Sequence, residues 1–240
     1  MRKTLFLVMA KNFIYLCKMQ PSPSQENYLK AIYKLQAKTG IATNQELAAL
    51  VQATPASVTN MLRKLMEAGW VEYEAYQGAT LTSSGRNEAV TLVRKHRLWE
   101  VFLVEKLHYD WDAVHALAEE LEHVGGEELI NRLDAFLEHP AYDPHGDPIP
   151  NSKGVVRVRQ HAIAASEAKE GDVFVVCGVK DSSSLFLRHL DKLNIALGKV
   201  YTLKECLEFD RSAVWVEQEG VLTNVSNEVA KNVLIQLTHE

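Results

Sequence analysis

Residues 94–124 read RKHRLWEVFLVEKLHYDWDAVHALAEELEHV, a stretch rich in imidazole and carboxylate side chains. The potential metal ligands in it are His96, Glu100, His115, Glu119, Glu122 and His123. The first two are four residues apart, and the last four stand at offsets 0, +4, +7 and +8, which fall within a sector of about 100° on a helix. Carboxylates gathered on one face repel one another unless a cation lies between them. The stretch therefore predicts two helical segments that hold a divalent metal ion.

The alternative for this stretch is a solvated acidic helix face, because Glu and His four residues apart also occur on ordinary exposed helices. Apolar residues on the remaining faces favour the metal site, since they give each helix a side to bury. These residues are Leu98, Val101, Phe102, Leu117 and Leu121.

The segment before this stretch begins with two predicted helices. The break at residues 21–24 supplies an N-cap, and a helical period of apolar residues runs from Gln25 to a stop at Gly40. Residues 43–46 then form a capping-box pattern, with Thr at the first position and Glu at the fourth. A second, shorter helix is therefore expected after Thr43.

A third helix and a hairpin complete this segment. Thr54 is the expected N-cap, Pro55 the first helical residue and Gly69 the stop. Residues 70–82 alternate on either side of a Gln-Gly turn, which predicts a small β-hairpin. Helix, helix, short turn, helix and hairpin is the order of a winged helix-turn-helix unit.

The third helix presents small polar side chains at its N-terminus, where they can approach bases and phosphates, and basic side chains further along. Including the wing tip, the expected DNA contacts are Thr54, Pro55, Ala56, Ser57, Thr59, Asn60, Arg63, Lys64 and Gln77. Residues 20–82 hold five basic and five acidic side chains, so a protein-interaction module is the alternative. The order of the elements favours double-stranded DNA.

Residues 83–139 are predicted to be mainly helical and carry a strong negative charge. Six basic and twelve acidic side chains give a balance of −6. Negative charge beside a DNA-binding unit opposes binding unless a cation neutralises it, which predicts a metal-controlled switch. The apolar side of these helices is large enough to predict a two-fold homodimer. It is formed by Trp99, Phe102, Leu103, Leu107 and Trp111.

The C-terminal part changes in character. A Pro/Gly-rich linker contains Asp143 and His145, which are either ligands or ordinary turn formers. Short strands follow from about residue 166, and Asp181 stands at the end of the first of them. Short alternating strands of this kind, with one helical piece among them, predict a small β-barrel.

The expected fold class is mainly α with a small β part. The expected division is an extra leader that is disordered or not native at 1–20, a winged helix-turn-helix domain at 21–83, a helical dimerisation and metal-binding domain at 84–140, a linker at 141–165 and a β-domain at 166–240.

The composition indicates a soluble globular protein, with 47% hydrophobic and 24% charged residues and a net charge of −5. Cys17, Cys177 and Cys206 are far apart and lack metal-ligand spacing, which suits a reducing cytoplasm and excludes a disulfide framework. The apolar run near the N-terminus is too short to span a membrane and lacks a cleavage site. We therefore expect a cytoplasmic protein with no membrane partner, whose natural start is Met19.

Taken together, the chain resembles the diphtheria-toxin-repressor family of metal-activated transcriptional repressors, and within it the manganese-transport regulators with a C-terminal extension. The resemblance covers about residues 24–150, and the later strands resemble the family's SH3-like, ferrous-transport-A-type domain more loosely. The matching stretches are ENYLKAIY at 26–33, TPASVTNMLRKLMEAGWVEY at 54–73, the motifs KHRLxE at 95–100 and VHxxAxxxEHV at 114–124, and DPHGDPIP at 143–150.

The resemblance implies a dimeric repressor that binds palindromic operators when loaded with metal, with two metal sites per chain. Glu119, Glu122 and His123 would hold the primary metal with Asn27 of the first helix. The second site would be built by His96, Glu100 and His115, with Asp143, His145 and Asp181 contributing.

Two positions depart from the family pattern. Asn27 stands where relatives have Met or Asp, and Glu119 stands where many have Cys. A carboxylate in place of a soft thiolate favours Mn²⁺, with Fe²⁺ as the alternative.

Two other functions compete with this interpretation. A metalloenzyme could use the same donors, but the sequence offers no nucleophile motif or phosphate loop, so we expect neither catalysis nor a small organic substrate. A metal-independent winged-helix regulator with a solvated acidic face is the other alternative.

Overall fold

The computed structural model describes residues 20–157, 159–217 and 219–238, so residues 1–19 of the expected leader lie outside the described residues. Residue contacts divide the chain into one compact unit that ends at Leu92 and another that begins at Val93. Each unit is described by itself, and the expected domain boundaries stay predictions.

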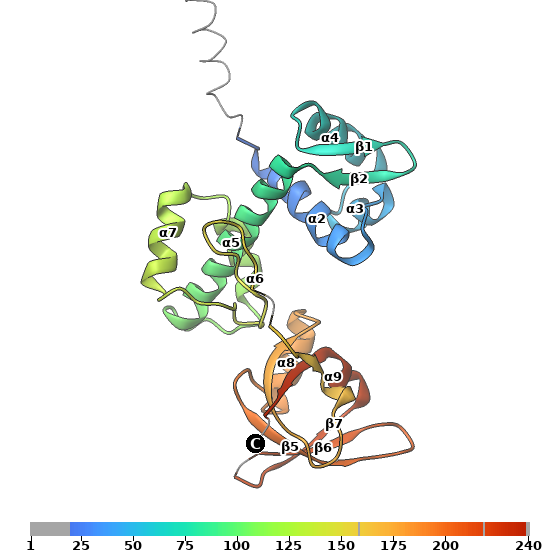
Figure 1. The fold of residues 1–240 in the computed structure, drawn as a ribbon, viewed down its shortest axis with the longest axis vertical. Helices are drawn as coiled ribbons and strands as arrows, with labels where there is room; N and C mark the ends of the chain where they lie inside the picture. The colour runs from blue at the N-terminus through green and yellow to red at the C-terminus, as the bar shows by residue number, and fades with distance from the viewer. Residues whose placement is uncertain (1–19, 158, 218, 239–240) are drawn as a thin grey trace, which may run out of the picture. The chain divides into compact units, whose positions relative to one another are not determined.

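The N-terminal unit has the order of a winged helix-turn-helix (Figure 1). Its elements are α2 (Pro23–Thr39), α3 (Asn44–Leu50), α4 (Pro55–Glu67), β1 (Val71–Glu74), β2 (Gly78–Leu81) and the first part of α5 (Ser83–Glu105). The strands pair antiparallel from Val71↔Leu81 to Glu74↔Gly78. The sequence predicted this arrangement.

Helix caps in this unit follow from local sequence. Thr43 and Glu46 form the predicted capping box, and Thr54 caps α4 ahead of Pro55 as expected. The predicted start of α2 at Gln25 was two residues late. Ser22 is the N-cap, because its side chain and that of Gln25 cap each other's backbone N–H groups, and the proline after Ser22 suits the first helical position.

The core of this unit is built from one face of each helix. In α4, Val58, Leu62 and Leu65 are buried at helical spacing, and each fully buried side chain contributes about 1.5–3 kcal/mol. They meet Leu29 and Leu47 of the preceding helices in one cluster. The opposite face of α4 stays exposed, which leaves it free to contact a partner.

The second unit begins with helices. It contains the rest of α5, then α6 (Val114–Leu121) and α7 (Glu127–Phe136). Leu98 and Val101 of α5 pack with Ile130 and Leu133 of α7. The predicted single helical face over residues 115–123 was too long: α6 ends at Leu121, and the next two residues lie in a turn that leads to Gly125 and Gly126.

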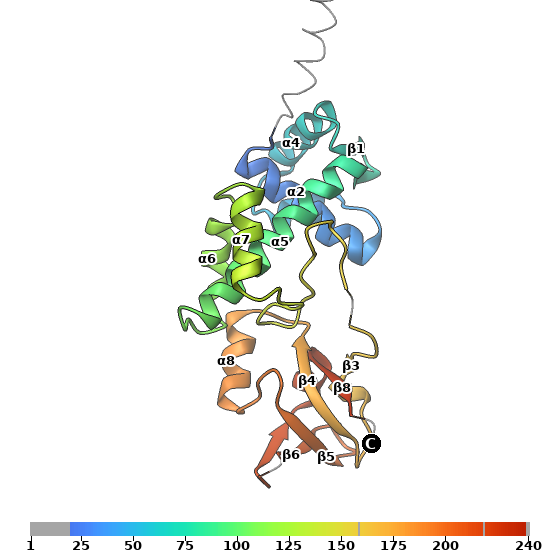
Figure 2. The same cartoon turned by 60° about the vertical axis from the view of Figure 1, so that its left-hand side comes forward.

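The rest of the second unit is a six-stranded antiparallel sheet with the order β3-β8-β4-β5-β6-β7 (Figure 1, Figure 2). Its elements are β3 (Ile163–Ala164), η1 (Ala165–Glu167), β4 (Val173–Val179), α8 (Ser184–Lys192), β5 (Val200–Cys206), β6 (Ala213–Glu217), β7 (Leu222–Val225), α9 (Asn227–Asn232) and β8 (Val233–Leu237). Phe174, Tyr201 and Trp215 are fully buried at its centre. The predicted fold class is confirmed, although β3, η1 and α9 were not predicted from the sequence.

None of the helices among the described residues combines the length and apolar character needed to cross a bilayer.

Candidate metal centre

Five acidic or histidine side chains are buried in the second unit and come from three segments. Helix α5 provides His96 and Glu100 one turn apart, and Glu122 follows α6. Asp143 and His145 belong to the segment before the β-domain. Burial of so many ionisable groups is costly unless they pair with one another or hold an ion.

The first group consists of His96, Glu100 and His115. Nε2 of His96 lies 3.0 Å from Oε1 of Glu100 and 3.1 Å from Nδ1 of His115, and that Nδ1 is 3.0 Å from the same Oε1. The side chain of His115 is 53% exposed, which gives the group an opening to solvent. Neighbouring ligands of an octahedral ion with bonds of about 2.1 Å are about 3.0 Å apart, so the three atoms fit such an ion.

The second group consists of Glu100, Asp143 and His145, all buried. Oε2 of Glu100 faces Nδ1 of His145 at 3.7 Å. Asp143 also shapes the turn, since its Oδ1 accepts hydrogen bonds from the backbone N–H groups of His145 and Asp147 at 2.9 and 3.0 Å. Glu100 therefore belongs to both groups, with one oxygen toward each.

The charges of these groups depend on one another. Burial raises the pKa of Glu100, but its polar contacts with His115, His145 and His96 outweigh it and hold the pKa below its ordinary value. Burial, with repulsion from Glu100 and Asp147, raises the pKa of Asp143 to about 7. Burial lowers the pKa of His145, but its polar contact with Glu100 and the charge of Glu100 raise it to about 9 overall. Glu100 is thus the carboxylate that stays ionised.

The side chains predicted for the primary site do not form a third group among the described residues. Oε2 of Glu122 lies 2.6 Å from Nδ1 of His96, while its Oε1 is 3.9 Å from His123 Nε2. Oε1 of Glu119 lies 3.7 Å from Nε2 of His115. The two predicted ligand sets are therefore interleaved: Glu122 of one set pairs with His96 of the other, and Glu119 lies near His115.

Two further predicted ligands are not members of these groups. Asn27 is exposed on α2 in the N-terminal unit. Asp181 is exposed and accepts a hydrogen bond from the N–H of Ser183, the N-cap of α8. Neither belongs to the two groups of acidic and histidine side chains described above.

Two residues that the sequence did not predict support the groups. Arg97 places Nε 3.4 Å from Oδ2 of Asp143 and Nη2 3.1 Å from Oδ2 of Asp147. Trp111 accepts a hydrogen bond from Nε2 of His145 through its backbone oxygen, at 2.9 Å. The position of Arg97 inside the KHRLxE motif was the available signal for the first, whereas a backbone acceptor leaves no signal in the sequence.

Most of the predicted DNA contacts are exposed in the N-terminal unit. Exposed residues among them are Thr54, Pro55, Ala56, Ser57, Asn60, Arg63, Lys64 and Gln77. Thr59 is half-buried, and its hydroxyl donates to the Pro55 oxygen and accepts from the Asn44 side chain. Tyr76 at the wing tip is fully exposed.

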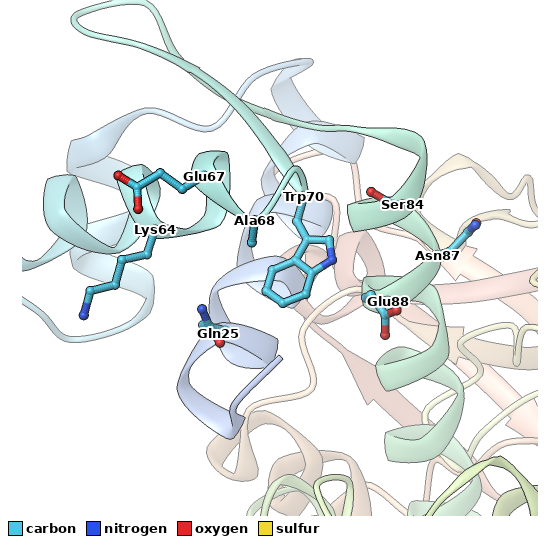
Figure 3. Close-up of a pocket in the computed structure, with 8 residues that line it drawn as sticks. All are labelled: Gln25, Lys64, Glu67, Ala68, Trp70, Ser84, Asn87 and Glu88. Carbon is cyan, nitrogen blue, oxygen red and sulfur yellow. The ribbon is translucent and has the colours of Figure 1, made fainter. Parts of the chain in front are cut away.

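A pocket of about 630 Å³ also lies in the N-terminal unit (Figure 3). Trp70 forms its floor, and Gln25, Lys64 and Glu88 are among the side chains around it. It contains none of the predicted metal ligands, so we do not assign it to the metal centre.

A winged helix-turn-helix unit together with convergent buried nitrogen and oxygen donors defines the class of metal-responsive DNA-binding regulators. The family described as iron dependent repressor matches this chain in two parts, its N-terminal DNA binding domain at residues 21–79 and its metal binding and dimerisation domain at residues 82–151.

Individual relatives agree. An uncharacterised HTH-type transcriptional regulator of Methanocaldococcus jannaschii is 40% identical over 118 residues, which is 49% of this chain and 94% of that protein. The HTH-type transcriptional regulator MntR of Lysinibacillus sphaericus is 37% identical over 118 residues, 49% of this chain and 84% of that protein. A solved manganese-dependent transcriptional repressor in complex with manganese has a TM-score of 0.77 and 32% identity, covering 89% of this chain and all of that one. The chain belongs to the iron-dependent repressor family of metal-dependent transcriptional repressors.

Proposed function

We propose that this chain is a manganese-activated repressor that binds palindromic operator DNA as a homodimer in the cytoplasm. The observation that carries the proposal is the convergence of four side chains on the buried Glu100 carboxylate: His96, His115, Asp143 and His145. Ordinary exposed helix faces do not bury such a set.

The chemistry of the donors supports Mn²⁺. All of them are imidazole nitrogens or carboxylate oxygens, without a thiolate, and the carboxylate that the two groups share is a ligand that suits Mn²⁺. The solved relative that contains manganese supports the same choice, while the description of the family keeps Fe²⁺ as the alternative. We propose two ions per chain.

The residues of the two groups have distinct proposed roles. His96, Glu100 and His115 hold one ion, and Asp143 and His145 join Glu100 at the second group. Asn27, Glu119, Glu122, His123 and Asp181 remain proposed ligands. A bound divalent cation supplies positive charge among carboxylates that otherwise repel one another and the phosphates of DNA.

Residues of the winged helix-turn-helix unit have proposed roles in DNA binding. Ser57 and Asn60 are exposed on the first turns of α4 and approach the edges of bases. Arg63, Lys64 and Gln77 contact phosphates and set the register on the duplex. Thr54 and Pro55 fix the helix N-terminus that faces the backbone.

The test is DNA binding with and without metal. Double-stranded DNA selected from a random pool by the Mn²⁺-loaded protein serves as the operator in gel shifts. We expect Mn²⁺ to raise the affinity about 5- to 150-fold over chelator, the range typical of such coupling. A variant with Glu122→Ala and His123→Ala should lose this response, and equal affinity of the parent in both conditions would overturn the proposal.

Titration of the protein with Mn²⁺ in a calorimeter separates the proposal from a metal-independent winged-helix regulator. The proposal expects saturable binding near two ions per chain. A solvated acidic face would give only weak, unsaturable binding that disappears in moderate salt.

A further inference from the structure

Trp111, in the loop between α5 and α6, contacts both the metal centre and the β-domain. Its backbone oxygen accepts a hydrogen bond from Nε2 of His145 at 2.9 Å. Its ring stacks on the imidazole of His145, with centroids 6.2 Å apart and planes 17° apart. Its indole Nε1 donates to Oδ1 of Asp191 in α8 at 2.9 Å, and the ring packs against the core of the β-domain.

The hydrogen bond to the Trp111 backbone oxygen decides which nitrogen of His145 is available to bind a metal ion. A carbonyl oxygen only accepts, so Nε2 of His145 must carry a proton. Nδ1 is then the nitrogen that faces Oε2 of Glu100, at 3.7 Å. Backbone carbonyls commonly orient metal-binding histidines in this way.

The contacts beside Trp111 tie the same loop to the β-domain. The backbone oxygen of Asp112 accepts a hydrogen bond from Oγ of Ser184. The Asp112 carboxylate lies 3.5 Å from Nε of Arg188. The backbone oxygen of His145 accepts a hydrogen bond from the N–H of Val179 in β4 at 3.0 Å. His145 is therefore held between the loop and the sheet.

We propose that Trp111 is a positioning residue that couples metal occupancy of the Glu100, Asp143 and His145 group to the seating of α8 and β4. The inference rests on the proposed metal-binding function. Coupling between binding free energies is reciprocal, so a metal that tightens the seating is itself bound more tightly by the seated domain.

The test uses the full chain and a matched pair of variants at an exposed site. Asp191→Ala removes the acceptor for the indole, whereas Asp191→Asn keeps an amide oxygen that can accept the same hydrogen bond. Trp111→Phe removes the donor and keeps an aromatic ring. Calorimetry gives the Mn²⁺ affinity, and amide hydrogen exchange follows Val179 and residues 184–192 with Mn²⁺ and with chelator.

In the parent we expect Mn²⁺ to slow exchange at Val179 and in α8. Trp111→Phe and Asp191→Ala should bind Mn²⁺ about two- to tenfold more weakly, the effect of one typical hydrogen bond, and should lose part of the metal-dependent slowing. Asp191→Asn should behave as the parent. Unchanged exchange at Tyr201 and Trp215 in the sheet core shows that the variants stay folded.

This inference would be overturned if Trp111→Phe and Asp191→Ala both kept the Mn²⁺ affinity of the parent and the same Mn²⁺-dependent slowing of amide exchange. Mn²⁺ binding itself would then still stand. An Asp191→Asn variant that behaves like Asp191→Ala would also overturn it, because the charge of Asp191 would then matter and not the hydrogen bond. If the parent itself fails to bind Mn²⁺, the proposed function and this inference fall together.

Discussion

The winged helix-turn-helix unit and the metal centre keep their polar side chains in opposite environments. In the first, Ser57, Asn60 and Lys64 are exposed on one helix, each placed by its own position in α4. In the second, Glu100 and His145 are buried and come from segments far apart in the chain. Substitutions in the first should have graded effects, because its exposed side chains act separately, whereas those in the second should act together.

The largest effect is expected from Glu100→Gln, because this carboxylate belongs to both ligand groups. The amide keeps the size of the side chain but not its charge, so both ions should be lost together with the entire Mn²⁺-dependent gain in DNA affinity, about 5- to 150-fold. Gel shifts with and without Mn²⁺ measure it. Glu120→Gln, an exposed change on α6, is the control and should keep the gain.

A smaller effect on Mn²⁺ binding is expected when a ligand is replaced in only one of the two groups. His115→Gln should remove the ion of the partly exposed group, and His145→Gln that of the buried group. Each should weaken binding at its own site about 10- to 100-fold and binding at the other site by a smaller factor, because the two groups share Glu100. Calorimetric stoichiometry measures this, and loss of both ions from either variant would mean that the groups form one indivisible site.

In the winged helix-turn-helix unit, Lys64→Ala is expected to weaken DNA binding a few-fold. Removal of one phosphate contact should weaken binding similarly for all sequences and reduce the salt slope of the affinity by about 0.9. Binding isotherms at several salt concentrations measure the slope. Lys38→Ala, an exposed change in the same unit outside the predicted interface, should leave the slope unchanged.

The smallest effect concerns the pH dependence of metal-free stability. The folded-state pKa values of His145, about 9, and Asp143, about 7, both lie above the ordinary values of 6.5 and 3.8. Both groups therefore bind protons more tightly in the folded state, and their stabilisation is complete below the ordinary values. It is lost as pH rises, between about 4 and 7 for Asp143 and between 6.5 and 9 for His145.

Thermal melts in chelator should accordingly give a melting temperature that falls by a few degrees from about pH 6 to about pH 8.5. His145→Gln should flatten the upper part of this dependence. Mn²⁺ should oppose the fall, since its ligands bind in their deprotonated forms. A melting temperature that rises with pH in chelator would contradict the charge assignments.

The winged helix-turn-helix unit could be predicted from the sequence because the residues that cap its helices lie close to them in the chain. Thr43 with Glu46, and Thr54 with Pro55, cap their own helices within a few residues. The single error there, the start of α2, arose because Ser22 and Pro23 outcompete a later cap. Local hydrogen bonds of this kind require no knowledge of the rest of the chain.

The arrangement of the candidate metal ligands could be predicted only in part. The i, i+4 spacing of His96 and Glu100 places them on one helix face, and the residue types of Asp143 and His145 suggested ligands. The pairing of Glu122 with His96 joins the end of α6 to α5, and the support from Trp111 depends on a backbone oxygen. Contacts between segments far apart in the chain follow from tertiary packing, which spacing does not encode.

The two oxygens of Glu100 point to different histidines, and this division has a consequence for dose response. If both groups held an ion, Glu100 would supply a ligand oxygen to each, and its orientation for one group would favour the other. Metal binding would then be cooperative, and repression would switch over a narrower span of metal concentration than independent sites allow.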